Sequence, residues 1–419
     1  MNDDLADVLR MEGGRIRATL IRLTGDITLA EDSVQDAVVV AMERWRVDGL
    51  PERPAAWLTT VARNKALDRL RREAGRPVRE QAAQMLDSFA ADPVTSAGSD
   101  ALLRDDMLRL MFTCCHPALS PDARLALTLR IVAGLSTTEI ARLCLTADAT
   151  MGQRISRAKR KIAISRIPYR VPQDHELPDR LPSVLSTIVA VFTLGHHSPD
   201  GAADRRVDLA TEAIRLGRML AELMPDELEC LGALALMIAT HARHEARLDV
   251  HGDLILLADQ DRSRWKHDDI AEASTLVEGC LRRRRVGAYQ VQAAIACLHG
   301  LARSYAETDW PQIVELYEML VTLQPTVVVR VNQAVALAEN GDLTRARAVI
   351  ASVDAGTVES WHLYWAVAAD LARRAGDTQG EVANLARALQ CPANDADRRL
   401  LQGRLAQANA AIRRASSAR

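Results

Sequence analysis

The sequence predicts an all-α protein, and three observations support that fold class. Aromatic residues make up only 3% of the chain, whereas helix-favouring alanine, leucine and arginine are abundant. Apolar residues recur at intervals of three and four, and no alternating strand pattern of useful length is present. Hydrophobic residues account for 48%, which excludes global disorder, and the 419 residues suffice for two or three domains.

Two amphipathic helices are predicted near the N-terminus. Residues 30–46 place apolar side chains at the three-and-four spacing of one helix face, which should face the core: Val34, Ala37, Val38, Ala41, Met42 and Trp45. A second helix, residues 54–72, begins with a proline, which suits the first turn of a helix. This second helix carries a basic cluster that could contact DNA, formed by Arg63, Lys65, Arg69, Arg71 and Arg72.

Two breaks divide the chain. Residues 75–100 are polar and weakly periodic, which is typical of a flexible linker. Residues 168–182 contain four prolines, and helices rarely cross such a run. We therefore expect one domain at 1–74, a linker at 75–100, a second domain at 101–170, a proline-rich linker at 171–182, and a helical extension at 183–419.

The second domain contains the outline of a helix-turn-helix. Ser136 and Glu139 fit a capping box at the start of a short helix. A brief connection at 145–147 leads into a second helix, residues 148–164. In such a pair the second helix enters the major groove of DNA.

The second helix has one apolar and one polar face. Met151, Ile155, Ala158 and Ile162 share the face that should pack inward. Between residues 142 and 170 there are eight basic residues and one acidic residue. Arginine can read guanine and glutamine can read adenine, while flanking cations hold phosphates. The candidate DNA-binding residues are Gln153, Arg154, Ser156, Arg157, Arg160 and Lys161, with Lys159 as a further flanking cation. A solvated basic helix is the alternative, and the capping box, turn and polar face favour DNA.

The C-terminal part shows a weak internal repeat. Short turns at Asp309, Asp342 and Asp377 are separated by 33 and 35 residues. Helix–turn–helix units of about 34 residues are typical of tetratricopeptide-type solenoids. We predict tetratricopeptide-like repeats at about 290–390, with chance similarity of the turns as the alternative.

Four segments, taken together, resemble the extracytoplasmic-function sigma factors of bacterial RNA polymerase. Residues 29–37 (LAEDSVQDA) are similar to the family's polymerase-docking helix, and residues 56–72 to its −10 recognition helix. Residues 134–141 and 155–161 are similar to its −35 reader. Residues 111–120 and 259–265 (DQDRSRW) are similar to a subgroup with a long helical extension. The resemblance thus implies sigma domain two, sigma domain four and a C-terminal helical-repeat domain.

The resemblance also implies partners and site residues. Core RNA polymerase and promoter DNA would be the partners, and the polymerase would carry out the chemistry. The polymerase-binding residues would be Asp32, Gln35 and Asp36, whose charged and amide groups can pair with arginines. The −10 contacts would come from Arg63, Asn64, Asp68, Arg71 and Arg72, and residues 47–53 would capture an extruded base.

The charge distribution and the terminal sequence bear on location and internal contacts. The first 171 residues carry a net charge of +4 and the rest −6, which permits an intramolecular contact between the extension and the sigma domains.

The seven cysteines are irregularly spaced without a C-x-x-C pair, which is typical of reduced thiols. The N-terminus is acidic, unlike a signal peptide, and apolar runs such as 231–239 are too short to span a bilayer. We expect a soluble cytoplasmic protein with no membrane partner.

Other candidate sites have structural interpretations. Cys114, Cys115 and His116 lack the usual zinc spacing, and His241 and His244 do not complete a metal motif. Residues 259–265 are either a contact surface or latch, or a buried ion-pair corner that fixes the fold. Phosphate-binding glycine loops, nucleophile elbows and dinucleotide fingerprints are not found. We therefore expect no enzyme activity, no catalytic residues, no metal and no cofactor.

A second functional class stays open at this point. The chain could be a helix-turn-helix regulator with a tetratricopeptide-type interaction domain that does not act as a polymerase subunit. The feature that favours the sigma-factor reading is the pair of helices at 30–46 and 54–72, since an ordinary repressor has no need of a polymerase-docking module.

Overall fold

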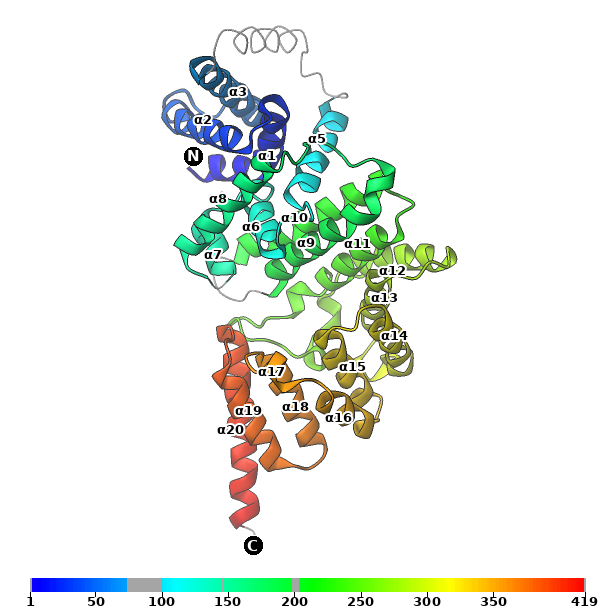
Figure 1. Cartoon of the computed structure of the whole chain (residues 1–419). Helices are drawn as coiled ribbons and strands as arrows, with labels where there is room; N and C mark the ends of the chain where they lie inside the picture. The colour runs from blue at the N-terminus through cyan, green and yellow to red at the C-terminus, as the bar shows by residue number, and fades with distance from the viewer. Residues whose placement is uncertain (1, 74–98, 145, 198–202, 418–419) are drawn as a thin grey trace. The chain divides into compact units, whose positions relative to one another are not determined.

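The structure is a computed structural model that describes residues 2–73, 99–144, 146–197 and 203–417, and these residues are helical almost throughout (Figure 1). Within them the β pairing is a single isolated bridge between Leu248 and Leu254. The all-α prediction is confirmed. The chain divides into two compact units, residues 1–191 and 192–419. Most of the predicted linker at 75–100, and Leu145 in the predicted turn, lie outside the described residues.

The first unit begins with three packed helices, α1 (Asn2–Thr24), α2 (Ile27–Asp48) and α3 (Pro54–Glu73). The Asp26 side chain caps α2 by accepting from the backbone N–H groups of Thr28 and Leu29. Trp45 and Trp57 pack together with ring centroids 5.5 Å apart. Both tryptophans therefore anchor the contact between α2 and α3.

The rest of the first unit contains a helix-turn-helix. Its helices are α5 (Ser99–Cys114), α6 (Pro121–Ile131), α7 (Thr137–Leu143), α8 (Asp148–Ile164), the short η1 (Asp174–Glu176) and α9 (Leu177–His197), which continues past the division between the units. The predicted capping box is present: Ser136 Oγ accepts from Glu139 N, and Glu139 Oε2 accepts from Ser136 N. The bounds of α8 match the predicted 148–164.

Helix α9 differs from the sequence expectation in two ways. It begins at Leu177, inside the segment expected to be a linker, and includes Pro182. Pro182 is the sixth residue of α9, so it removes one intrahelical hydrogen bond, and the burial of the apolar side chains that follow it offsets this loss. By length and composition α9 could also span a membrane, although the sequence had indicated no such run. This is weak evidence, since Val184, Leu185 and Ile188 are buried as in a core helix.

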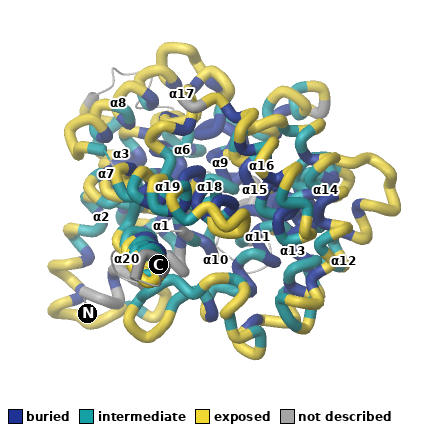
Figure 2. The backbone as a smooth tube through the Cα atoms, turned by 90° about the horizontal axis from the view of Figure 1, so that it is seen from below, coloured by how far each residue is buried: buried dark blue, intermediate teal, exposed yellow. Residues whose placement is uncertain are grey.

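The second unit is built from helices that pack in sequence order. They are α10 (Ala203–Leu223), α11 (Leu228–His241), η2 (His244–Ala246), η3 (Leu257–Asp259), η4 (Arg262–Arg264), α12 (His267–Arg282), α13 (Ala288–Leu301), η5 (Tyr305–Glu307), α14 (Trp310–Leu323), α15 (Val327–Glu339), α16 (Leu343–Ala351), α17 (Ala355–Val358), α18 (His362–Arg374), α19 (Thr378–Gln390) and α20 (Asp395–Ser417). Helix α11 is buried along most of its length, because α10, α12 and α13 all pack on it (Figure 2).

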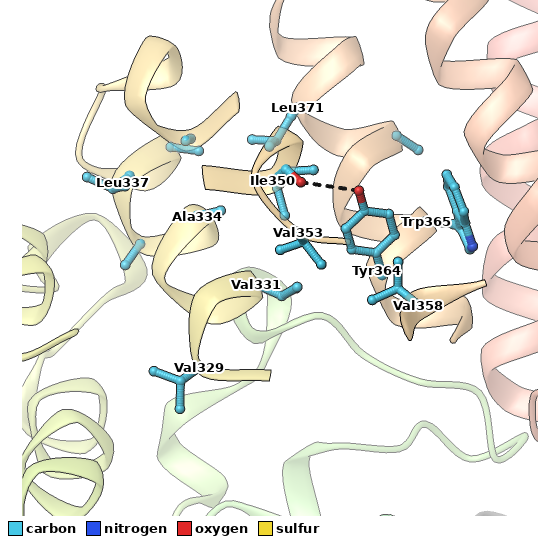
Figure 3. Close-up of a cluster of buried hydrophobic side chains, with 14 of the residues drawn as sticks. Val329, Val331, Ala334, Leu337, Ile350, Val353, Val358, Tyr364, Trp365 and Leu371 are labelled. Atoms are coloured by element: carbon cyan, nitrogen blue, oxygen red, sulfur yellow. Dashed lines mark hydrogen bonds between the residues drawn. The ribbon is translucent and has the colours of Figure 1, made fainter. Parts of the chain in front are cut away.

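The three aspartates of the predicted repeat have the same structural role. Asp309, Asp342 and Asp377 are the N-caps of α14, α16 and α19, and each carboxylate accepts from the backbone N–H three residues later. Each capped helix pairs with the helix before it, so three helical hairpins follow one another. A shared core joins these hairpins, and in it the Tyr364 hydroxyl donates to Ile350 O at 3.3 Å (Figure 3). Classification of these hairpins as tetratricopeptide repeats stays a prediction.

Candidate nucleic-acid interface

Helix α8 has the two faces that the sequence predicts. Met151, Ile155, Ala158 and Ile162 are buried against the unit's core. The predicted reading residues Gln153, Ser156, Arg157, Arg160 and Lys161 are exposed, and Arg154 is half-buried. The side chain of Ala147 cannot cap this helix, but Thr138 Oγ1 donates to Asp148 Oδ2 at 2.7 Å and links α7 to the first residue of α8. The arrangement presents a rigid, cationic helix face to solvent.

Three cations on the flanks of α8 have intramolecular partners. Arg154 pairs with Asp122 at 3.4 Å, and Lys161 donates to Ala118 O. Lys159 pairs with the buried Glu31 of α2, so its side chain is not free to hold a phosphate in this arrangement. The expectation that Lys159 is a flanking DNA contact stays a prediction, and it requires Lys159 to exchange Glu31 for a phosphate. Arg157 and Arg160 form no ion pair with any described residue.

The candidate −10 residues line α3. Asn64, Asp68, Arg71 and Arg72 are exposed, and Arg63 is half-buried with its Nε atom buried and unpartnered among the described residues. A weak ion pair of 3.8 Å joins Arg71 to Asp68. The connection at 47–53 that leads into α3 is exposed along nearly its whole length. Both segments are therefore accessible to DNA.

The candidate polymerase-binding residues lie on the outward face of α2. Asp32 and Gln35 are exposed and Asp36 is half-buried. Arg69 of α3 holds both acids, at 2.9 Å from Asp32 and 2.8 Å from Asp36, and these hydrogen-bonded pairs oppose the effect of burial and raise the pKa of Arg69. The acids are thus already positioned by an arginine, which the helical spacing alone did not reveal.

Two apolar residues on the same face escaped the sequence analysis. Val39 and Met42 are 55% and 52% exposed. They follow Asp32 and Gln35 at helical intervals, so the outward stripe of α2 is acidic at its start and apolar at its end. The periodic pattern predicted Met42 to be a core residue. The signal that could have found the stripe is the continuation of the Asp32–Gln35 spacing into apolar side chains.

A buried carboxylate joins the first three helices to the helix-turn-helix. Glu31 of α2 accepts from Arg130 Nε of α6 at 2.9 Å and pairs with Lys159 of α8. The nearby Arg17 of α1 is also buried and donates to Ile131 O at 2.6 Å. Burial lowers the pKa of Arg17 to about 10, while the negative charge of Glu31 opposes that shift. We refer to Glu31, Arg17, Arg130 and Lys159 as the Glu31 cluster.

Two further contacts reinforce this junction. The Tyr169 hydroxyl lies 2.9 Å from Ala18 O of α1 and 3.0 Å from Asp106 O of α5. Arg22 of α1 donates to the buried Asp106 carboxylate at 2.8 Å. In this structure the first three helices and the helix-turn-helix region are therefore packed against each other within the first unit.

The residues considered for metal binding have other surroundings. Cys114 and Cys115 are buried, and burial raises the pKa of both thiols. His241 and His244 stack with centroids 4.3 Å apart, while Glu245 pairs with Lys266. Among the described residues, no group of three possible metal ligands is found.

The segment 259–265 is not the ion-pair corner that one interpretation expected. Asp261 accepts from Ser263 N and Oγ, and no described ion pair joins an acid to an arginine within the segment. Arg262 instead donates to the carbonyl oxygens of His299 and Ala302 and lies over the Trp265 ring, with Cζ 4.4 Å from its centroid. The segment, which precedes α12 in the chain, contacts α12 through Trp265 and α13 through Arg262, and it contains no internal ion pair among the described residues.

Comparisons with known families and proteins agree with this architecture. Residues 9–76 match sigma-70 region 2, residues 109–162 match sigma-70 region 4, and residues 180–281 match a family of unknown function, DUF6596. An uncharacterized protein of Rhizobium meliloti is 42% identical over 325 residues, which cover 76% of each chain. No solved structure matches.

Two named relatives come from Mycobacterium tuberculosis. The ECF RNA polymerase sigma factor SigL is 33% identical over 148 residues, or 35% of this chain and 78% of SigL. The probable ECF sigma factor SigI is 31% identical over 160 residues, or 38% of this chain and 54% of SigI. With regions 2 and 4 matched in order, the chain belongs to the extracytoplasmic-function sigma factors, non-enzymatic subunits that direct RNA polymerase to promoters, and it carries a helical extension that contains the DUF6596 region.

Proposed function

We propose that this sigma factor reads the −35 element with the exposed face of α8. The observation that carries the proposal is the separation of faces on that helix: four apolar residues are buried, while Gln153, Arg157 and Arg160 are exposed. Arginine and glutamine in the major groove can form paired hydrogen bonds to guanine and adenine. Arg154 and Lys161 would then fix the helix on the phosphates, after exchanging their present intramolecular partners for DNA.

Arg157→Ala tests this assignment. Loss of a paired base contact should reduce discrimination between a cognate and a scrambled −35 duplex by about 1–3 kcal/mol. The measurement is competition binding of the holoenzyme to the two duplexes at fixed salt. Lys161→Ala is the matched control, because loss of a phosphate contact should weaken binding to both duplexes alike and reduce the salt dependence. Unchanged discrimination in Arg157→Ala would contradict the assignment.

For the −10 element, we propose that α3 and the connection at 47–53 act together. The support is their exposure and the run of polar side chains, Arg63, Asn64, Asp68, Arg71 and Arg72, along one helix. Cations hold the backbone of the melted strand, and an extruded base would enter the 47–53 connection.

For polymerase docking, we propose the outward stripe of α2. The polar half of the contact comes from Asp32, Gln35 and Asp36. The apolar half comes from Val39 and Met42, whose side chains are exposed to water in the free protein. Interfaces commonly combine an apolar centre with a charged rim. In the complex, polymerase cations would compete with Arg69 for the two aspartates.

The double substitution Asp32→Lys and Asp36→Lys should reduce core-polymerase affinity by about a hundredfold, since two interface charges change sign. The measurement is binding of full-length protein to core polymerase without DNA. Because the substitutions also place like charges beside Arg69, a second variant adds Arg69→Glu and restores opposite charges within the unit. Continued loss in that variant supports docking through α2, and recovery of binding would show that only the internal repulsion mattered.

We also propose that the extension regulates the sigma domains or binds partners, and that the protein acts in the cytoplasm. The support is that the second unit has its own extensive apolar core, so a ligand or partner bound to it could act on the sigma domains through a folded domain. Its net negative charge, opposite in sign to the first unit, is compatible with an intramolecular contact. The three successive Asp-capped hairpins support a tetratricopeptide-like scaffold for protein contacts.

A further inference from the structure

The segment 259–265 meets the end of α11 and the end of α13 at a site rich in cations. Trp265 is buried beside Ala242 and Ile270. The guanidinium groups of two arginines lie near its ring, with Arg262 Cζ 4.4 Å and Arg243 Cζ 5.7 Å from the centroid. We refer to Arg243, Arg262, Trp265 and His299 as the arginine corner.

Each residue of the arginine corner has a buried polar nitrogen without a hydrogen-bond partner in the described structure. The atoms are Arg243 Nε, Arg262 Nη2, Trp265 Nε1 and His299 Nδ1. The arginine and tryptophan nitrogens can only donate, so what they lack is an acceptor. An unsatisfied buried donor costs about 1–3 kcal/mol, and native proteins contain few of them. Three such donors at one corner, beside a histidine nitrogen whose role depends on the tautomer, indicate a missing acceptor group.

The charges around the corner have the same sign. Burial lowers the pKa of Arg243 to about 10, and the nearby cations Arg247 and Arg262 lower it further. Burial, followed by the charges of Arg243 and Arg262, lowers the pKa of His299 to about 4. No ion pair among the described residues neutralises Arg243 or Arg262. Burial lowers the pKa of Arg262, and the charge of the exposed Glu307 opposes that shift only in part.

Arg262 also reaches a hollow on the surface. The hollow has a volume of about 460 Å³, and its lining includes Arg262, Ser263, His267 and Arg303. Its lining, as far as the structure describes it, contains no aspartate or glutamate. Arg262 Nη1 is occupied by the carbonyls of His299 and Ala302, at 2.7 and 2.6 Å, which fixes the guanidinium in place while Nη2 stays unpartnered. An anion that enters from the hollow would therefore meet a guanidinium that is already held in place.

We propose that the arginine corner binds the oxyanion of a small soluble molecule, either a phosphate or a carboxylate group. A planar guanidinium matches both groups, and both are acceptors that can satisfy several donors at once. The partner is a small molecule because the hollow lined by Arg262, at about 460 Å³, has the size of a small-ligand site. The site lies wholly in the extension, so its occupation does not depend on promoter recognition.

Calorimetric titration of the full-length protein tests the proposal. The probes are inorganic phosphate and succinate, each compared with sodium chloride at equal ionic strength. We expect saturable binding of one of the two anions at one site per chain. A tighter response to phosphate identifies a phosphorylated ligand, and a tighter response to succinate identifies a carboxylate. The proposal would be overturned if neither anion bound saturably at concentrations up to 10 mM, since a dissociation constant above roughly 10 mM corresponds to no more than a single weak ion pair.

Variants then locate the site. Arg262→Gln and Arg243→Gln should each weaken anion binding about tenfold or more, because a charged hydrogen bond is lost. Arg285→Gln is the matched control, since Arg285 is exposed in the turn between α12 and α13. If Arg262→Gln fails to fold because it loses its contacts with α13, two milder variants replace it. Arg262→Lys keeps the positive charge but loses the planar guanidinium, and Trp265→Phe keeps an aromatic ring but loses the indole N–H donor. Binding as tight in these variants as in the unaltered protein would place the anion elsewhere and overturn the proposal.

Discussion

Buried charge occurs in both units of the molecule, and the two cases differ in one respect. In the Glu31 cluster a buried carboxylate lies among cations from three other helices and satisfies two of them directly. In the arginine corner the cations are comparably enclosed, but no carboxylate is among them. The first arrangement contains its own counterion and is complete in that sense, although Arg17 Nη2 lacks a hydrogen-bond partner among the described residues, whereas the second arrangement contains no counterion.

This difference indicates two uses of buried charge. A complete cluster holds helices together, and the Glu31 cluster joins α2 to α6 and α8 of the helix-turn-helix region. The arginine corner has, among the described residues, no buried ion pair that joins helices in this way.

The largest expected effect concerns the complete cluster. Glu31→Ala leaves Arg130 and Lys159 without their shared counterion, and breaking a buried ion pair in this way costs about 3–5 kcal/mol. Because both cations retain some exposure, we expect about 3 kcal/mol. The measurement is the free energy of unfolding of the first unit, from urea denaturation of the full-length protein.

The neighbouring Asp32 supplies the control. Asp32 also pairs with an arginine, but its side chain is 54% exposed. Asp32→Ala should therefore cost less than about 1 kcal/mol, since exposed ion pairs contribute little. If both substitutions destabilised the unit equally, the Glu31 cluster would not differ from a surface ion pair and the comparison of the two clusters would fail.

The sequence predicted the local features of this fold well. The capping box of Ser136 and Glu139, the bounds of α8 and the turns at Asp309, Asp342 and Asp377 all follow from side chains that act on a backbone a few residues away. Residue type and spacing are enough for such features, because their partners lie within one helical turn.

Features that depend on distant residues could not be predicted in the same way. Glu31 lies in a motif read as a docking helix, yet its partners are 99 and 128 positions away along the chain. Residues 259–265 contain acids and arginines at salt-bridge spacing, but Arg262 contacts carbonyl groups of α13 instead. Helix α9 includes Pro182 because its apolar side chains find a core that the proline pattern does not reveal. The site residues of α2, α3 and α8 stay predictions until they are tested by binding.

The smaller expected effect concerns the incomplete corner and its response to acid. His299 packs edge-on to Trp310 and has a pKa of about 4 in the folded protein, against about 6.5 when unfolded, because it is buried near two arginines. Between these values the unfolded chain binds the additional proton. The stabilising contribution of neutral His299 is therefore complete above pH 6.5 and is lost as the pH falls toward 4, by roughly 3 kcal/mol at most.

His299→Gln should remove that part of the acid sensitivity, and His251→Gln, at an exposed position, should not. His116 and His241 have pKa values lowered in the same direction, so the measured quantity is the difference between each variant and the unaltered protein in urea unfolding at pH 7 and pH 4.5. An anion bound at the arginine corner would offset the two arginine charges and make protonation of His299 easier. The acid sensitivity due to His299 should then be smaller in the presence of the bound anion. An unchanged difference between His299→Gln and the unaltered protein, with and without a saturating anion, would show that the two arginines and the histidine do not share one site.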